Sequence, residues 1–192
     1  MPHPPFTIDA LVSGSAPAFF RFFDEEAFAD NPAWAGCYCR FPFVDHAVEA
    51  WDGDAAEKNR AGTAMRIARR GIQGYLARAE GRVVGWVNAG PGRLYPAANL
   101  GGPELTGPRI GHILCFVVAP AWRRRGVARA LLGAACEGLA AQGMTHAQGN
   151  PRAGAKTPAA LHHGPLALYL EAGFEIHAQD PDDGSVFVRK AL

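Results

Sequence analysis

The chain has 192 residues, 48% of them hydrophobic, which suits one domain with a substantial core. Its 19 basic and 18 acidic side chains nearly cancel, a balance that disfavours a protein whose whole surface binds nucleic acid. No apolar run approaches the ~20 residues needed to cross a bilayer, and the N-terminus lacks a signal-peptide pattern. We therefore expect one domain over residues 1–192, a cytoplasmic location, no membrane contact and reduced cysteines.

The first 73 residues predict two helices joined by an irregular loop. A short edge strand at 6–8 precedes a helix over 15–30, where phenylalanines form one broad apolar face. Residues 34–51 are rich in aromatic side chains without a clean period, which indicates a structured loop. A second helix is expected from Asp52 or Asp54 to about residue 70, and its apolar stripe is Ala61, Met65, Ile67 and Ala68.

The remaining residues, 74–192, predict a sheet interleaved with helices. A hairpin over 74–79 and 82–89 is closed by the two-residue turn Glu80-Gly81. Residues 90–108 form a long loop rich in Gly and Pro, and 109–119 is a strand apolar on both faces, as a central strand should be. The later elements are a helix over 126–142, a strand over 145–149, a short helix over 165–172, and strands over 174–178 and 185–190. This order predicts a mixed α/β sheet with helices on both faces.

A strand, a turn and a helix follow one another between Val117 and Ala128, and the turn contains three arginines. The first amides of a helix have no intrahelical partner, and the helix dipole adds positive potential there, so a pyrophosphate fits such a position. Small residues at Gly126 and Ala128 let phosphate oxygens approach the backbone. The arginines add charged contacts, including one to a 3′-phosphate. The alternative is a solvated basic turn before an ordinary amphipathic helix.

This segment resembles the pyrophosphate motif of the GCN5-related N-acetyltransferase (GNAT) superfamily, Arg/Gln-x-x-Gly-x-Gly/Ala, at Arg123, Gly126 and Ala128. Residues 167–174 resemble a second landmark of the superfamily, FYxxxGF, and the two landmarks occur in the expected order. The resemblance implies a single-domain acyl-CoA N-acyltransferase fold with a mixed, mostly antiparallel sheet and helices on both faces. Residues 1–73 would supply the N-terminal helices and the acceptor-side loop, and residues 74–192 the CoA-binding core.

The resemblance implies an N-acetyltransferase that moves an acetyl group from acetyl-CoA to the amine of a small molecule or peptide, by direct attack in a ternary complex. A homodimer is a family-level expectation. Tyr169 stands where the family often has the acid that protonates the departing CoA thiolate, and the alternative is a core tyrosine. The residues implied to bind acetyl-CoA are Phe116, Val117, Val118, Arg123, Arg124, Arg125, Gly126, Val127, Ala128 and Asn150.

The general base has no clear candidate, because residues 112–116 lack the carboxylate that many family members have on this strand. His112 has a suitable ordinary pKa, but it equally suits the start of a strand. Cys115 offers a nucleophile for a covalent mechanism, although a cysteine in an apolar strand is more often inert packing. Two other functions therefore stay open: an acyl-CoA sensor without catalysis, and nucleic-acid binding by the arginine cluster.

The acceptor pocket is expected between the first helices, their loop and residues 90–108. Its candidate substrate-binding residues are Tyr38, Trp86, Tyr95 and Cys115, with Trp34, Phe41 and Phe43 as further aromatic candidates. The 150–164 loop is placed to close over the site with Asn150, Lys156, His162 and His163, and a solvated loop is the alternative. Cys37 and Cys39 with His46 have the wrong spacing for structural zinc, so we expect packing and no metal.

Overall fold

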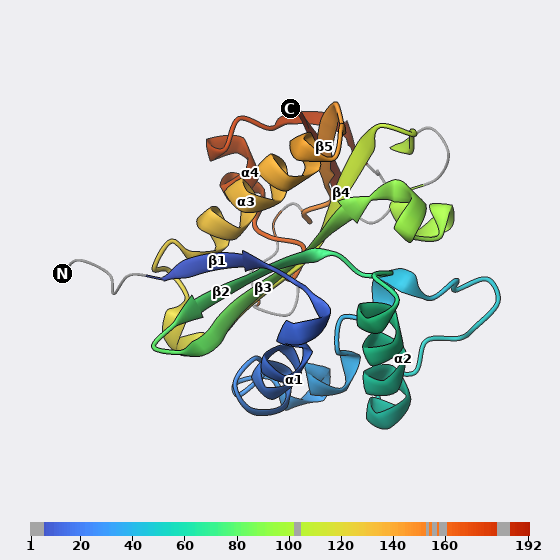
Figure 1. Cartoon of the computed structure of the whole chain (residues 1–192). Coiled ribbons are helices and arrows are strands. Elements are labelled where there is room, and N and C mark those ends of the chain that lie inside the picture. The colour runs from blue at the N-terminus through green and yellow to red at the C-terminus, as the bar shows by residue number, and fades with distance from the viewer. Residues whose placement is uncertain (1–5, 102–104, 153, 155–156, 158–160, 180–184) are drawn as a thin grey trace.

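One sheet organises the protein. The computed structural model describes residues 6–101, 105–152, 154, 157, 161–179 and 185–192. Within them, a seven-stranded sheet has the order β1-β2-β3-β4-β5-β7-β6, and β4 and β5 are its parallel pair among otherwise antiparallel neighbours. Helices α1 and α2 lie on one side of the sheet and α3 and α4 on the other (Figure 1). The predicted fold class is confirmed.

The elements follow the predicted order. They are β1 (Thr7–Ala10), α1 (Ala16–Glu25), α2 (Ala56–Ala68), β2 (Gly74–Ala79), β3 (Arg82–Pro91), β4 (Ile110–Val118), α3 (Val127–Ala141), β5 (His146–Gly149), α4 (Leu166–Glu171), β6 (Glu175–Gln179) and β7 (Val186–Ala191). The first helix ends earlier than expected, at Glu25. The irregular stretch after it contains two short 3-10 turns, Pro32–Cys37 and Phe41–Phe43. The hairpin turn is confirmed, since Glu80 and Gly81 both have positive φ, at 52° and 75°.

The predicted apolar stripe of α2 is correct only for Ile67, which is buried. Met65 is 56% exposed, and Ala61 and Ala68 are exposed as well. The buried side chains of the helix are Asn59, Thr63 and Ile67. Helical periodicity identifies one face of a helix, but here two polar residues occupy the face that is covered.

These buried polar side chains hold the loop that precedes α2. Asn59 Nδ2 donates to the carbonyl oxygens of Gly36 at 3.0 Å and Asp52 at 2.9 Å. Thr63 Oγ1 donates to the carbonyl of Tyr38 at 3.0 Å. Buried polar groups are stable when they are paired in this way. Helix α2 therefore fixes the shape of residues 32–53, which form one wall of the cavity described below.

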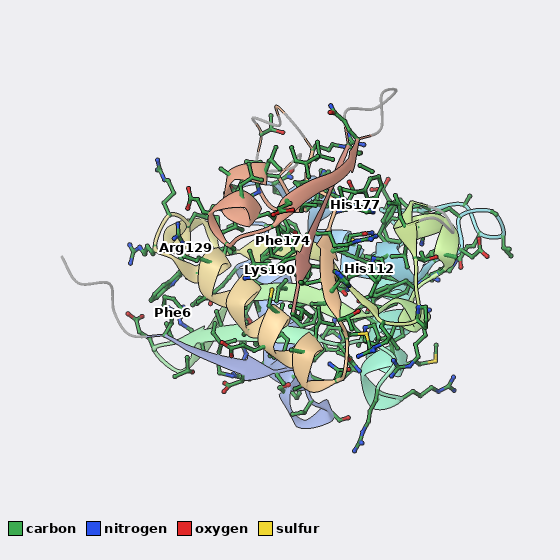
Figure 2. All side chains as sticks on the ribbon, turned by 90° about the horizontal axis from the view of Figure 1, so that it is seen from above. Phe6, His112, Arg129, Phe174, His177 and Lys190 are labelled. Atoms are coloured by element: carbon green, nitrogen blue, oxygen red, sulfur yellow. The ribbon has the colours of Figure 1, made fainter. Side chains whose placement is uncertain are left out.

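The core fills both faces of the sheet. On one face, the ring of Phe19 from α1 meets Trp86 of β3 edge-on, with 5.1 Å between ring centroids. On the other face, α3 buries Val127, Leu131, Leu132, Ala135 and Leu139. Figure 2 shows Phe174 and Lys190 side by side near the C-terminal hairpin, where the Lys190 ammonium lies 6.0 Å from the ring centroid. Among the described residues, no helix is long and apolar enough to span a bilayer.

Candidate active site

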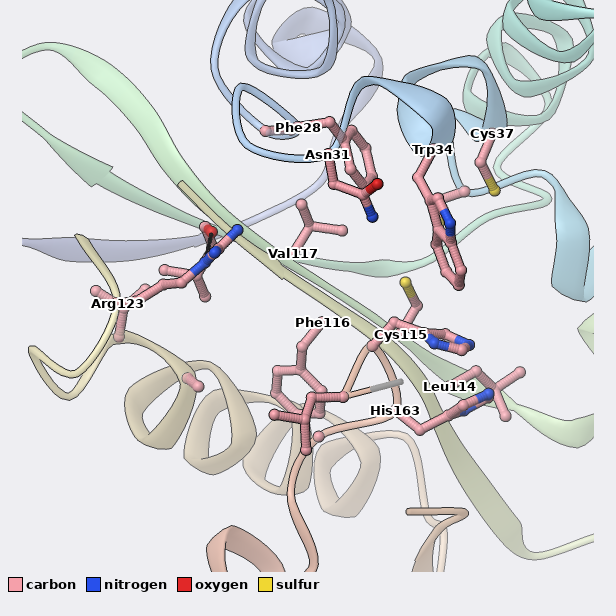
Figure 3. A pocket seen from close by; sticks show the side chains of 18 of the residues that line it. Phe28, Asn31, Trp34, Cys37, Leu114, Cys115, Phe116, Val117, Arg123 and His163 are labelled. Atoms are coloured by element: carbon pink, nitrogen blue, oxygen red, sulfur yellow. Dashed lines mark hydrogen bonds between the residues drawn. The ribbon is translucent and has the colours of Figure 1, made fainter. Parts of the chain in front are cut away.

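A cavity opens where β4 and β5 separate. The two strands pair from Ile110 with His146 to Ile113 with Gly149, and β4 then continues alone to Val118. The β3–β4 register skips Leu114 at this point, which marks a bulge that bends the strand away. The cavity measures about 740 Å³. It is lined by the loop before α2, by residues 114–118, by the turn into α3 and by residues 161–165 (Figure 3).

The turn into α3 leaves the start of the helix open. Gly126 is the N-cap residue, has φ of 82°, and no side chain caps the helix there. The first-turn amides are therefore available to a ligand. A Cβ added to Gly126 would meet nothing within 4 Å, so the space in front of the turn is empty. An anion of phosphate size can reach the positive end of the helix through this opening.

Arg123 connects two segments of the chain through its guanidinium group. Its Nε donates to the carbonyl of Val118 at 3.0 Å, and both terminal nitrogens pair with the carboxylate of Asp30. The hydrogen bonds from Arg123 lower the pKa of Asp30. This ion pair joins the segment after α1 to the end of β4 across the mouth of the cavity.

The other cations differ in position. Arg124 lines the cavity, whereas Arg125 lies over the ring of Trp122, 5.3 Å from its centroid, and does not line it. Arg129 lines the cavity from the first turn of α3 (Figure 2) and pairs with Glu171 of α4. Arg129 is not among the predicted residues, although its place three residues after Gly126 puts it in the same helical turn as the uncapped amides.

Residues 161–164 lie against the free edge of β4. The amide of Phe116 donates to the carbonyl of His162 at 2.6 Å. The hydroxyl of Tyr169, whose side chain is fully buried, donates to the carbonyl of His163 at 2.8 Å. Burial raises the pKa of Tyr169 well above its ordinary value. In this state Tyr169 lies behind the 161–164 segment and does not line the cavity.

Two of the residues predicted on the 150–164 loop lie at the cavity. His162 and His163 line the cavity, whereas Asn150 does not. Lys156 lies outside the described residues.

Several aromatic candidates for the acceptor site lie elsewhere. Trp34 and Phe41 line the cavity, as does Cys115, but Tyr38, Phe43, Trp86 and Tyr95 do not. Trp86 is completely buried on a central strand under α1, and the Tyr95 hydroxyl donates to Asn88 Oδ1 at 2.7 Å. The Tyr38 hydroxyl points to Asp24, at 2.7 Å. Other aromatic side chains line the cavity without having been predicted, and these are Phe23, Phe28, Trp51 and Trp122.

The described lining of the cavity contains no carboxylate. No Asp or Glu lies among the described residues that line it. His112 is nearly completely buried and outside the lining, and burial followed by the charge of Arg189 lowers its pKa to about 4. Burial is also the main cause that lowers the pKa of His163 to about 3. Both imidazoles are therefore uncharged at neutral pH and are weak bases.

The thiols that line the cavity are those of Cys37, Cys39 and Cys115. None of the four cysteines of the chain forms a disulfide bond. Burial raises the pKa of Cys37 to about 11. In the part of the chain that the structure describes, no group of three or more His, Cys, Asp or Glu side chains is arranged to hold a metal ion.

A mixed sheet that opens between two parallel strands, beside an uncapped helix start, provides a cleft suited to a ligand that carries a phosphate. The sequence profile of the Acetyltransferase (GNAT) family matches residues 25–174, which is well over half of the chain. The chain belongs to this family and is an acyltransferase. No curated protein matches the sequence.

Solved structures agree on the fold. The PaiA N-acetyltransferase from Thermoplasma acidophilum, in complex with coenzyme A, has a TM-score of 0.59 at 13% identity and covers 98% of this chain and 99% of its own. The ribosomal-protein-alanine N-acetyltransferase from Brucella melitensis has a TM-score of 0.56 at 22% identity. The match covers 97% of this chain and 99% of the other. YncA from Salmonella typhimurium, with its cofactor acetyl-CoA, has a TM-score of 0.55 at 16% identity. The match covers 97% of this chain and 94% of the other.

Proposed function

We propose that the protein transfers an acetyl group from acetyl-CoA to an amine by direct attack in a ternary complex. The observation that carries the proposal is the open N-terminus of α3 at the mouth of a cavity that continues along the unpaired edge of β4. Family membership supports it. So do the coenzyme A and acetyl-CoA bound to two proteins of the same fold.

The proposed cofactor position follows the polar groups of the cavity. The pyrophosphate accepts hydrogen bonds from the amides of Val127 and Ala128, above the space in front of Gly126. Arg124 and Arg129 line this end of the cavity and supply positive charge. The pantetheine arm lies along residues 116–118. Asn150 stays a proposed pantetheine contact, although it does not line the cavity in the present state.

The proposal includes a movement of residues 161–164. The amide of Phe116, which would donate to the pantetheine arm, donates instead to the carbonyl of His162. The hydroxyl of Tyr169 donates to the carbonyl of His163. Pantetheine binding replaces the first hydrogen bond and draws the segment away from the strand. The same movement frees the Tyr169 hydroxyl, which then protonates the departing CoA thiolate.

The proposed acceptor has an apolar or aromatic body. Its side of the cavity is formed by Phe28, Trp34, Phe41 and Trp51, and no acidic side chain is among the described lining residues. Aromatic walls favour ligands that bury apolar surface. A polycation would lose hydration in this space without gaining a carboxylate partner.

The experiment is an amine panel with acetyl-CoA, in which CoA release is followed by chromatography. Tryptamine, phenethylamine and a peptide with an N-terminal phenylalanine represent aromatic acceptors, and spermidine and an aminoglycoside represent polycations. We expect turnover of aromatic amines and little turnover of polycations. Absence of acetyl-CoA binding would refute the proposal. Binding without turnover of any amine would favour an acyl-CoA sensor, which a cavity without carboxylates also suits.

A further inference from the structure

We propose that Cys39 and Cys115 share one proton between their sulfur atoms and together accept the proton of the incoming amine. This inference rests on the proposed function, because an amine must react in the cavity for the pair to act. It supplies the base that the strand leading to the phosphate-binding turn lacks.

The first support is the position of Cys115 on the sheet. In the β3–β4 register Cys115 is the direct partner of Asn88, so the two side chains lie next to each other on the same face. Trp86 lies two residues before Asn88 and shares that face. Figure 3 shows the thiol of Cys115 pointing away from β4 into the cavity, toward Trp34.

The second support is a set of hydrogen-bond donors around the sulfur of Cys39. Asn88 Nδ2 donates to Cys39 Sγ at 3.2 Å. The amide cannot turn around, because its oxygen accepts the hydroxyl of Tyr95 at 2.7 Å. The indole nitrogen of Trp86 is buried without a hydrogen-bond partner, yet it acts on Cys39 from nearby. An unpaired buried N–H is costly, and a thiolate at Cys39 would give it an acceptor.

The third support is the backbone that places Cys39. Tyr38 and Cys39 have φ of 46° and 56°, so two consecutive residues with side chains adopt the left-handed conformation. Each costs about 1–2 kcal/mol, and such strain gathers at functional sites. Thr63 holds the turn through the carbonyl of Tyr38, at 3.0 Å. As a result Cys39 is only 2% exposed, pressed against β3 and β4.

The charges of the pair follow from these contacts. Burial alone would raise the pKa of Cys39, but the neighbouring Cys115 thiol, the indole N–H of Trp86 and the amide of Asn88 outweigh burial and lower it. The hydrogen bond to Cys39, together with burial, holds the pKa of Cys115 well above its ordinary value. The other titratable groups acting on the pair are Cys37, Tyr95 and Tyr169. When the pair loses a proton, the negative charge therefore rests on Cys39, and Cys115 keeps its own proton.

The reaction then balances. The arriving ammonium gives one proton to the pair, which leaves both sulfurs protonated and the amine neutral. The amine nitrogen bonds to the acetyl carbon, the carbon–sulfur bond of acetyl-CoA breaks, and the second amine proton ends on the CoA sulfur. The pair returns its proton to solvent before the next turnover.

The first test measures thiolate absorbance against pH without any acceptor. We expect the wild type to contain one thiolate that titrates below an ordinary cysteine. Cys39→Ser should remove it, and Trp86→Phe, which keeps an aromatic ring in the core, should shift it to higher pH. Cys136→Ser is the matched control, because Cys136 lies on α3 outside the cavity lining, and it should leave the thiolate unchanged. A wild type without this thiolate would overturn the proposal.

The second test follows the rate of acetylation of whichever panel amine is turned over. We expect kcat/KM to rise with pH as the thiolate forms, and Trp86→Phe to move that rise to higher pH. Turnover with an unmoved profile would overturn the thiol pair and leave the proposed function intact. A failure of every amine would refute both proposals. Mass spectrometry that finds an acetyl group on Cys115, removed by the amine, would make Cys115 a nucleophile and overturn the base role.

Discussion

Gly126→Asp is expected to abolish coenzyme A binding. Gly126 has φ of 82° and open space around the position of a Cβ, so an aspartate fits sterically at a backbone cost of about 1 kcal/mol. Its carboxylate would stand beside the pyrophosphate. One such pair of like charges at roughly 4 Å costs about 4 kcal/mol at an effective dielectric constant near 20. Since 1.4 kcal/mol is about a tenfold change, the affinity should fall by at least roughly 100-fold.

Gly126→Ala is the matched control for this prediction. Alanine carries the same backbone cost without the charge, so its affinity should stay within about tenfold of the wild type. Calorimetric titration with coenzyme A measures both variants, and thermal unfolding verifies that the two are equally folded. Wild-type affinity in Gly126→Asp would refute the placement of the pyrophosphate at this turn.

Other variants test the surroundings of the site. Tyr169→Phe removes the hydrogen bond to His163, so the free energy of unfolding in urea should fall by about 1–2 kcal/mol. If Tyr169 is also the acid, kcat should fall while KM is kept, and an unchanged kcat would remove that role. Asn59→Ala removes two hydrogen bonds to part-buried carbonyls and should cost about 1–3 kcal/mol, whereas a loss below about 0.5 kcal/mol would contradict its role in holding the loop. Because the pKa of His112 is lowered to about 4 in the folded protein, its stabilising effect is complete above its ordinary pKa and is lost as pH falls from about 6.5 to 4. His112→Gln should flatten this part of the stability curve, and an unaltered curve would contradict the assignment.

Local patterns account for the elements that were predicted well. A pattern within about ten to fifteen residues predicts each of three elements: the hairpin closed by Glu80 and Gly81, the apolar strand β4, and helix α3. Helix α2 failed because its covered face carries Asn59 and Thr63, whose partners are carbonyls of the preceding loop. A periodicity argument treats polar side chains as exposed, and it cannot see partners supplied by another segment.

The candidate site divides in the same way. The open turn at the start of α3 could be predicted, because its amides, its small residues and its arginines are contiguous in the chain. The acceptor wall could not, since Trp86 is covered by Phe19 of α1 and Tyr95 packs on Phe43 and donates to Asn88, and no local pattern reveals contacts with such distant segments. The contacts of Cys39 could not be predicted either. They form because a strained turn packs against β3 and β4, and no local sequence pattern indicates that packing.

The most direct test of the acetyl-CoA site is an NMR titration of the wild-type protein with acetyl-CoA, following assigned backbone amides. The account predicts large shifts for Val127 and Ala128 at the start of α3. It also predicts a shift for Phe116, as its amide exchanges the carbonyl of His162 for the pantetheine arm. Unchanged amides at these three positions, with acetyl-CoA well in excess, would contradict it.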